Sequence, residues 1–337
     1  MNLFKTELHR LLRRRLSLLF GIVAVSGLVL LSVVLWFNSE SEVSSAEQAY
    51  GEEQAAVYQA ELDRCKADEG YFTDERNWGY DVGEDYPELS HAEVCDEMLS
   101  WGTDPSDHYM VYIFDFSAEG VWMLVGIAIV GGLLVMLLTA SAIGAEWSSG
   151  NMANLLVWHP NRLRVWGAKL AASLTLGAVA LVAMLLLGFG LLYLVAATSG
   201  QVGELDGRWW EESLAILGRT VVMGLGMTVL GAALAMLGRH TAIAGGVIAG
   251  YLIIGDLLVR LAGFAFNVKY PDLFSLYTWV GAWISGEMTL FANVMSANGE
   301  FEDQMILTAT DAGLLLGAIL ALFAGLATWS FAKRDVT

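Results

Sequence analysis

The chain has 337 residues, 56% of them apolar, and a net charge of −18. Apolar runs of about twenty residues argue against an ordinary soluble domain and indicate an integral membrane protein. Residues 39–120 hold 22 acidic and three basic residues, so the rest of the chain has a net charge of only +1. Such an acidic segment argues against nucleic acid as a partner.

Residues 1–15 alternate leucines with charged residues and end in three arginines, Arg13 to Arg15. This pattern predicts an amphipathic elbow segment lying along the inner membrane surface. A plain basic flank that only sets topology explains the same residues. The apolar run that follows, 16–37, is too long for a secretory signal, so we expect a retained membrane anchor.

The hydropathy pattern predicts six membrane-spanning helices, and hence an all-α integral membrane protein. The predicted spans are residues 16–37, 121–145, 167–197, 213–237, 241–264 and 309–332. Basic residues lie at alternate ends of these spans, which predicts that both termini, including the tail 333–337, are cytosolic. Residues 38–120 then form an acidic extracytoplasmic module between the first two spans.

Residues 273–295 approach spanning length but hold Glu287 and two glycines. A seventh span would place Lys333 and Arg334 outside, against the positive-inside bias. Short re-entrant or interfacial helices on the outer side, within residues 265–308, are therefore expected before the sixth span.

The outer module is predicted to contain one helix from Ser44 to Lys66, continuing the first span outward, and a second from Ser90 to Trp101. The cysteines, Cys65 and Cys95, fall in these two helices. An even cysteine pair outside the cytosol predicts a disulfide. The alternative is a metal site formed by His91, Cys95, His108 and a carboxylate.

A polar stretch, residues 146–166, separates the second and third spans, and three cations follow Pro160. Within it, residues 151–158 predict a short helix that begins after Gly150 and ends before Pro160. Met152, Leu155, Leu156 and Trp158 give this helix an apolar face. An apolar helix face on the cytosolic side is typical of a docking surface.

This stretch resembles the E-x-x-S-G…L-L…P-x-R…K loop of ABC-2 type transporter permeases. The matching residues are Glu146, Ser149, Gly150, Leu155, Leu156, Pro160, Arg162, Arg164 and Lys169. The ending from Phe331 to Asp335 is similar to the F-x-x-R-D ending of that family.

The resemblance implies the membrane subunit of an exporter in a bacterial cytoplasmic membrane, contacting lipids and working as a homodimer or with a second permease. Its partner would be a cytosolic ABC ATPase subunit in two copies, which would carry the ATP and Mg²⁺. The expected ATPase-coupling residues are Glu146, Ser149, Gly150, Asn151, Leu155, Leu156, Trp158, Pro160 and Arg162.

The chain has no G-x-x-x-x-G-K-[ST] phosphate loop and no common hydrolase motif, so we expect no enzyme activity and no cofactor from this chain alone. An amphipathic or lipid-like substrate, such as a drug, an antimicrobial peptide or a lipid, fits a permease of this kind. The alternative function is a non-transporting sensor or immunity protein whose acidic module binds a ligand or a metal.

Four charged residues lie inside or at the start of predicted spans: Arg219, Asp256, Arg260 and Asp311. Charges in a bilayer are costly and often mark a transport path, so these residues are candidates for one outer translocation cavity. The alternative is an Asp256–Arg260 pair that holds the helices together, with Arg219 and Asp311 at the membrane interface.

Overall fold

The computed structural model describes residues 3–74, 76–79, 82, 86, 89–266, 268–292 and 303–333. Arg334 and Asp335 of the family-like ending, and Glu300 and Glu302 of the expected outer segment, lie outside these residues. The chain divides into two compact units. Unit 1 consists of residues 1–33, 116–194 and 202–337, and unit 2 of residues 34–115 and 195–201.

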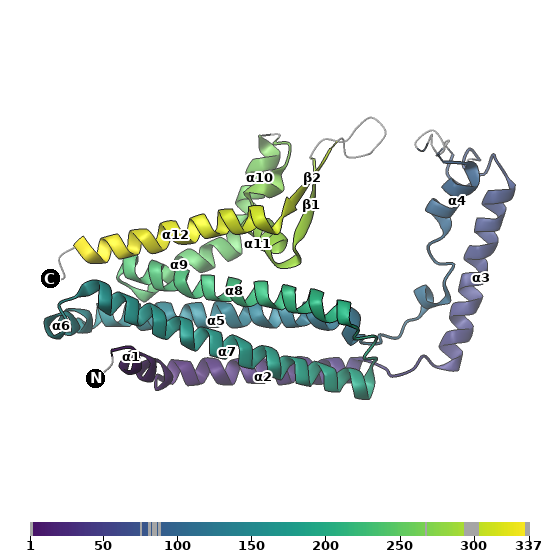
Figure 1. Cartoon of the computed structure of the whole chain (residues 1–337). Coiled ribbons are helices and arrows are strands. Elements are labelled where there is room, and N and C mark those ends of the chain that lie inside the picture. Colours follow the sequence, from purple (N-terminus) through teal and green to yellow (C-terminus); the bar gives the residue numbers. More distant parts are fainter. Residues whose placement is uncertain are drawn as a thin grey trace. The chain divides into compact units, whose positions relative to one another are not determined.

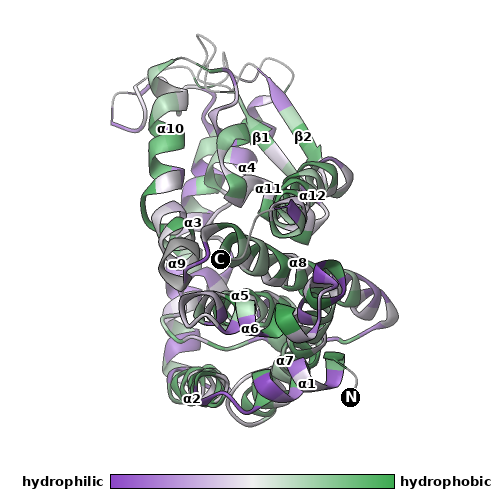
Figure 2. Ribbon diagram, turned by 90° about the vertical axis from the view of Figure 1, so that its left-hand side faces the viewer, coloured by the Kyte–Doolittle hydropathy of each residue, from purple (hydrophilic) through white to green (hydrophobic). Residues whose placement is uncertain are grey.

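The described residues contain five helices that are long and apolar enough to cross a membrane (Figure 1). They are α2 (Arg15–Asn38), α5 with the π-helical turn before it (Phe116–Ser148), α7 (Arg162–Ser199), α8 (Gly207–Gly238) and α12 (Ala309–Lys333). Each contains one of the predicted spans, 16–37, 121–145, 167–197, 213–237 and 309–332, because about 20 apolar residues match the hydrocarbon thickness. Their hydrophobic colouring dominates unit 1 in Figure 2.

The predicted fifth span, residues 241–264, is not one regular helix. It consists of α9 (Thr241–Gly250), a π-helical turn (Tyr251–Gly255) and α10 (Asp256–Ala265), and Figure 1 shows α10 turned away from the direction of α9. A ten-residue helix is about 15 Å long, half the hydrocarbon thickness, so neither half spans a bilayer alone. The π-helical turn explains the change of direction, because helices often bend sharply where such a turn interrupts them.

Residues 265–308 differ from the expected re-entrant helices. The described part of this segment contains a 3₁₀ turn (Pro271–Phe274), one α-helix, α11 (Leu276–Ser285), and then two strands. β1 (Glu287–Phe291) pairs antiparallel with β2 (Gln304–Thr308), with Glu287 opposite Thr308 and Phe291 opposite Gln304. A left-handed Gly286, at φ 108°, joins α11 to β1.

α5 and α8 pack most closely within unit 1, and small residues explain why. A Cβ added to Gly132 of α5 would lie 3.0 Å from the Cα of Gly224 of α8. One added to Gly231 of α8 would lie 2.6 Å from the carbonyl oxygen of Met136 of α5. Glycines at these points let the two backbones touch, as is common between helices in membranes.

In unit 2, α3 (Ser45–Ala67) and α4 (His91–Leu99) match the two predicted outer helices. α3 does not continue the first span as expected, because the chain leaves helical geometry between Asn38 and Ser45. The residues of α7 after Leu194 belong to this unit: Gln201 N–H donates to the carbonyl oxygen of Phe114 over 2.8 Å. Ser39 Oγ donates to the carbonyl oxygen of Ser199.

Candidate functional site

The end of unit 1 that holds α6 is the candidate coupling site. α6 spans Asn151–Trp158, as the sequence predicted, and lies between the end of α5 and the start of α7. Figure 1 shows α6, the start of α1 (Leu3–Leu12) and the end of α12 at this same end of the unit. Gly150 precedes α6 with φ 73°, a left-handed conformation that favours glycine.

The division of the α6 side chains into buried and exposed ones differs from the expected one. Met152 is buried at 1% exposure, and Leu156 packs with it against a core cluster that includes Ile143 and Trp166. Val157 and Trp158 are 80% and 82% exposed. The predicted apolar docking face is therefore wrong for Met152, and Val157 is an exposed residue that periodicity alone did not single out.

Leu155 is half-buried on α6, and Asn151, Ser149 and Pro160 are exposed around it. Ser149 Oγ donates to the carbonyl oxygen of Ala145 over 2.7 Å, which closes the last turn of α5. These residues occupy the two ends of α6 and set its position relative to α5 and α7.

Arg162 does not lie in a loop but begins α7. Its Nη1 atom donates to the carbonyl oxygens of Phe331 and Ala332, at 3.3 and 3.5 Å. A cation at the last carbonyls of a helix offsets the negative end of its dipole. Arg162 thus ties the start of α7 to the end of α12.

Beside α6 lies a buried ionic cluster that sequence reasoning missed. Lys169 of α7 has only 4% of its side chain exposed, and its Nζ atom lies 3.0 Å from Glu7 of α1 and 2.5 Å from Glu146 of α5. Arg10 Nη1 lies 3.7 Å from Glu7. A cavity of about 30 Å³ adjoins these residues and Arg14, with room for about one water molecule.

This cluster connects α1, α5 and α7 through one cation. Lys169 appeared in the sequence as one of three cations marking the cytosolic side, and nothing local pointed to Glu7. Lys169 Nζ donates to Glu7 Oε2 over 3.0 Å in a site with little water, where charge–charge interactions are strong. Only Ser149 and Gly150 separate α5 from α6, so the cluster lies within a few residues of α6 along the chain.

The four predicted cavity residues fall in three places. Arg219 of α8 donates from Nη1 to the carbonyl oxygen of Ile284 over 3.1 Å, at the end of α11. Asp256 pairs with Arg260 over 2.9 Å and accepts from Ser275 Oγ, next to the start of α11. Asp311 accepts from Thr308 Oγ1 over 2.6 Å at the start of α12.

Of these four, the structure pairs only Asp256 with Arg260, and Arg260 also lies 3.0 Å from Asp272. Arg219 and Asp256 are linked indirectly, because each holds one end of α11. One turn from Arg219, an apolar cavity of about 220 Å³ lies between α8, α11 and α12. Its lining includes Met223, Met227, Trp283 and Leu320.

In unit 2, Cys65 and Cys95 are joined in a disulfide, as the sequence predicted. His108 lies elsewhere in this unit: it is stacked on Tyr58, and its Nε2 donates to the carbonyl oxygen of Gly102 over 2.7 Å. The predicted metal set of His91, Cys95 and His108 is therefore not assembled.

Several long apolar helices and a basic, capped helical end define a multi-pass membrane protein. The family described as ABC-2 family transporter protein matches residues 1–336. The chain belongs to this family and is a permease of an ABC transporter. Comparisons with curated proteins and with solved structures gave no match.

Proposed function

We propose that this permease is the membrane subunit of an ATP-driven exporter and that α6 is the surface on which a separate cytosolic ATPase docks. The main observation in support is that Val157 and Trp158 are 80% and 82% exposed. They lie on a helix whose other side, with Met152 and Leu156, packs against the core. Exposed aromatic and aliphatic side chains at a rigid tip are typical anchors of a protein interface.

The proposed orientation places this end of unit 1 in the cytosol, with both termini, and places residues 38–120 outside a bacterial cytoplasmic membrane. The support is the charge distribution: Arg13 to Arg15, Arg162 and Lys333 all flank spans at one end, whereas the outer module is strongly acidic. Arg239, at the end of α8, lies 4.7 Å from the ring of Trp147 and so belongs to the same basic end.

Two ATPase copies would serve two permease chains, either identical or paired with a second permease. α2 and α12 have few buried residues, which suits contact with lipid or with a second membrane subunit. ATP and Mg²⁺ would be bound by the ATPase, since this chain carries no phosphate loop.

In the proposed mechanism, closure of the ATPases pushes on α6. The movement passes into α5, and through Glu146 and Lys169 into α1 and α7. The substrate class we propose is amphipathic or lipid-like. Its support is the 220 Å³ apolar cavity between α8, α11 and α12, with the cation Arg219 one turn away from Met223.

The test is a pull-down of the ATPase that co-purifies with the tagged wild-type chain in detergent. Val157→Asp combined with Trp158→Ala should release it. The matched control is Phe266→Ala, which removes an equally exposed aromatic ring, at 81%, from outside α6. Stoichiometric ATPase on the double variant would show that α6 is not the docking surface. A wild-type chain that binds no ATPase and moves no amphipathic probe would favour the sensor or immunity function instead.

A further inference from the structure

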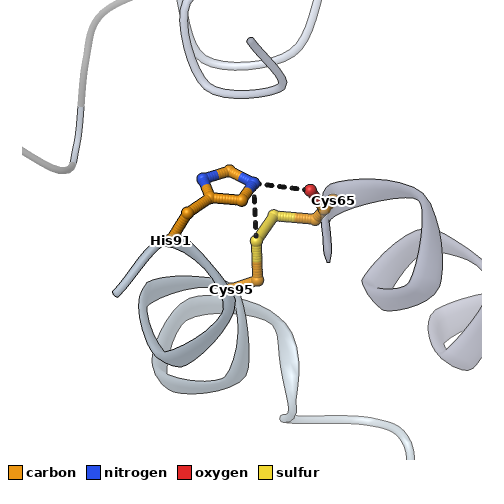
Figure 3. A group of neighbouring side chains, drawn as sticks. All are labelled: Cys65, His91 and Cys95. Carbon is orange, nitrogen blue, oxygen red and sulfur yellow. Dashed lines mark hydrogen bonds between the residues drawn. A yellow bond between two sulfur atoms is a disulfide. The ribbon is translucent and has the colours of Figure 1, made fainter. Parts of the chain in front are cut away.

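Cys65, His91 and Cys95 form one cluster in unit 2 (Figure 3). Cys65 lies in the last turn of α3, whereas His91 and Cys95 lie one turn apart on α4. Both cysteines are fully buried and His91 is half-buried. The potential ligand atoms of the three residues all lie within 4.8 Å of one another.

The imidazole of His91 points directly at the disulfide. Its Nε2 atom lies 2.7 Å from the carbonyl oxygen of Cys65 and 3.6 Å from Sγ of Cys95. Because a carbonyl oxygen only accepts, Nε2 carries the proton here and Nδ1 offers the lone pair.

The separation between nitrogen and sulfur matches that of two ligands on one metal ion. With metal–sulfur and metal–nitrogen bonds of about 2.3 and 2.0 Å, trigonal or tetrahedral geometry separates the two ligand atoms by roughly 3.5–3.7 Å. The observed 3.6 Å falls within this range. The imidazole is thus already placed as the third ligand for a cation held by two thiolates.

We propose that reduction of the Cys65–Cys95 disulfide converts this cluster into a binding site for a thiophilic cation, Zn²⁺ or Cu⁺. Two thiolates and an imidazole select such ions over Mg²⁺ and Ca²⁺. The acidic unit around the site favours cations, since residues 39–120 hold 22 carboxylic side chains against three basic ones.

The chemistry balances with a phosphine as reductant. The phosphine attacks one sulfur and breaks the S–S bond, and water then supplies the oxygen of the phosphine oxide and the protons of the two thiols. Binding of the cation releases those two protons. The proton on His91 moves from Nε2 to Nδ1, so that Nε2 ligates the metal.

The experiment uses the full chain in detergent micelles, both untreated and anaerobically reduced with a phosphine. Each sample is titrated with Zn²⁺ or Cu⁺ against a competing chromophoric chelator. The reduced protein should bind roughly one ion per chain and the oxidised protein none above background, because only thiolates ligate. X-ray absorption at the metal edge should show two sulfur ligands and at least one nitrogen.

The deciding variant is His91→Gln, whose side-chain amide keeps a donor for the Cys65 carbonyl oxygen but lacks the imidazole ligand. Its affinity should fall by about tenfold or more, since loss of even a supporting residue weakens metal sites by 10–100-fold. The matched control, His108→Gln, alters a histidine of the same unit outside the cluster and should bind like the wild type.

Equal metal binding by the oxidised and reduced protein would overturn the proposal. So would reduced His91→Gln that binds as tightly as the wild type, because binding by two loose thiols of an opened unit would not depend on His91. None of these outcomes depends on the ATPase or on transport.

Discussion

The ammonium group of Lys169 lies 2.5 Å from a carboxylate oxygen of Glu146 and is almost completely removed from solvent. Glu146 lies in the last turn of α5, and Lys169 also pairs with Glu7 of α1. A single cation therefore links α1, α5 and α7, the three elements through which the proposed mechanism transmits a push on α6.

Lys169→Met should destabilise the chain by about 3 kcal/mol, because it removes the cation that lies between the buried Glu7 and the half-buried Glu146 and leaves Glu7 only the longer contact with Arg10. The measurement is thermal unfolding of the purified protein in detergent. The matched control is Lys269→Met, which breaks a pair with Asp303 whose side chains are 57% and 51% exposed. That loss should be much smaller, because solvent screens an exposed ion pair. Equal effects of the two substitutions would mean that water reaches the Lys169 cluster freely.

Gly231→Ala should also lower stability, by about 1–3 kcal/mol, because the added methyl group meets the backbone of Met136 and overpacked cores have to shift. The control on the same helix is Gly226→Ala, where the nearest atom to the new Cβ is 3.7 Å away, on Leu320. It should be neutral or slightly stabilising, since alanine is the better helix former. The measurement compares the thermal unfolding temperatures of the two variants. An unchanged unfolding temperature for Gly231→Ala would show that α5 and α8 separate easily.

Arg162→Gln should loosen the last turn of α12 by about 1–2 kcal/mol, because hydrogen bonds from a charged group to two carbonyls are lost. Hydrogen exchange of the amides at residues 329–333 measures this directly. Arg164→Gln serves as the control, since its side chain is exposed two residues further along α7. Unchanged exchange in the Arg162 variant would assign this arginine to ATPase contact rather than to helix capping.

Asp256→Asn tests the two readings of the charged residues near α11. If Asp256 only joins α10 to the start of α11 through Ser275 and orients Arg260 on its own helix, the variant should unfold at a lower temperature, while transport per folded molecule survives. If these residues line the path, the fold and ATPase binding should persist, but substrate-stimulated ATP hydrolysis should disappear. We expect the second outcome, and unchanged stimulated hydrolysis in a well-folded variant would exclude Asp256 from the mechanism.

The start of α4 should respond to acid through Glu93. Hydrogen bonds from the backbone and hydroxyl of Ser90 hold the pKa of this carboxyl below its ordinary value. Its contribution to folding is therefore present above the ordinary range of a glutamate, about pH 4.3, and is lost as the pH falls through the depressed folded value.

Hydrogen exchange of the first-turn amides of α4 should accelerate over that acidic window in the wild type and show less pH dependence in Glu93→Gln. Glu97→Gln, which removes the same charge from the last turn, should keep the wild-type pH dependence. If both variants behave alike, the effect comes from net charge and not from the helix cap.

The sequence predicted most of unit 1 because lipid imposes a simple rule: about 20 apolar residues make a span. It also predicted α6 and the disulfide, where Gly150, Pro160 and an isolated cysteine pair leave few alternatives. It missed what depends on distant partners. Lys169 and Glu7 are 162 residues apart, and no periodicity connects them.

Segments whose apolar pattern fits more than one structure were also not predicted correctly. The run 287–291 is apolar enough to continue a helix, and only its pairing with residues 304–308 makes it a strand. The π-helical turn at residues 251–255 begins with Tyr251, whose hydroxyl accepts from the backbone of Leu276 over 2.8 Å, a long-range contact that local periodicity does not indicate. On α6, apolar residues fill all sides, so only packing shows that Met152 faces inward and Trp158 outward.

The acidic unit 2 is completed by residues 195–201, which are synthesised after the rest of the unit. Its main part, residues 34–115, emerges before α5, but Ser39 and Phe114 find their partners in residues 199–201, after two further spans have been made. The unit therefore stays incomplete until the end of α7 has been synthesised. A chain that stops within α7 would lack these contacts, so protection of the unit from protease should report that α7 is complete.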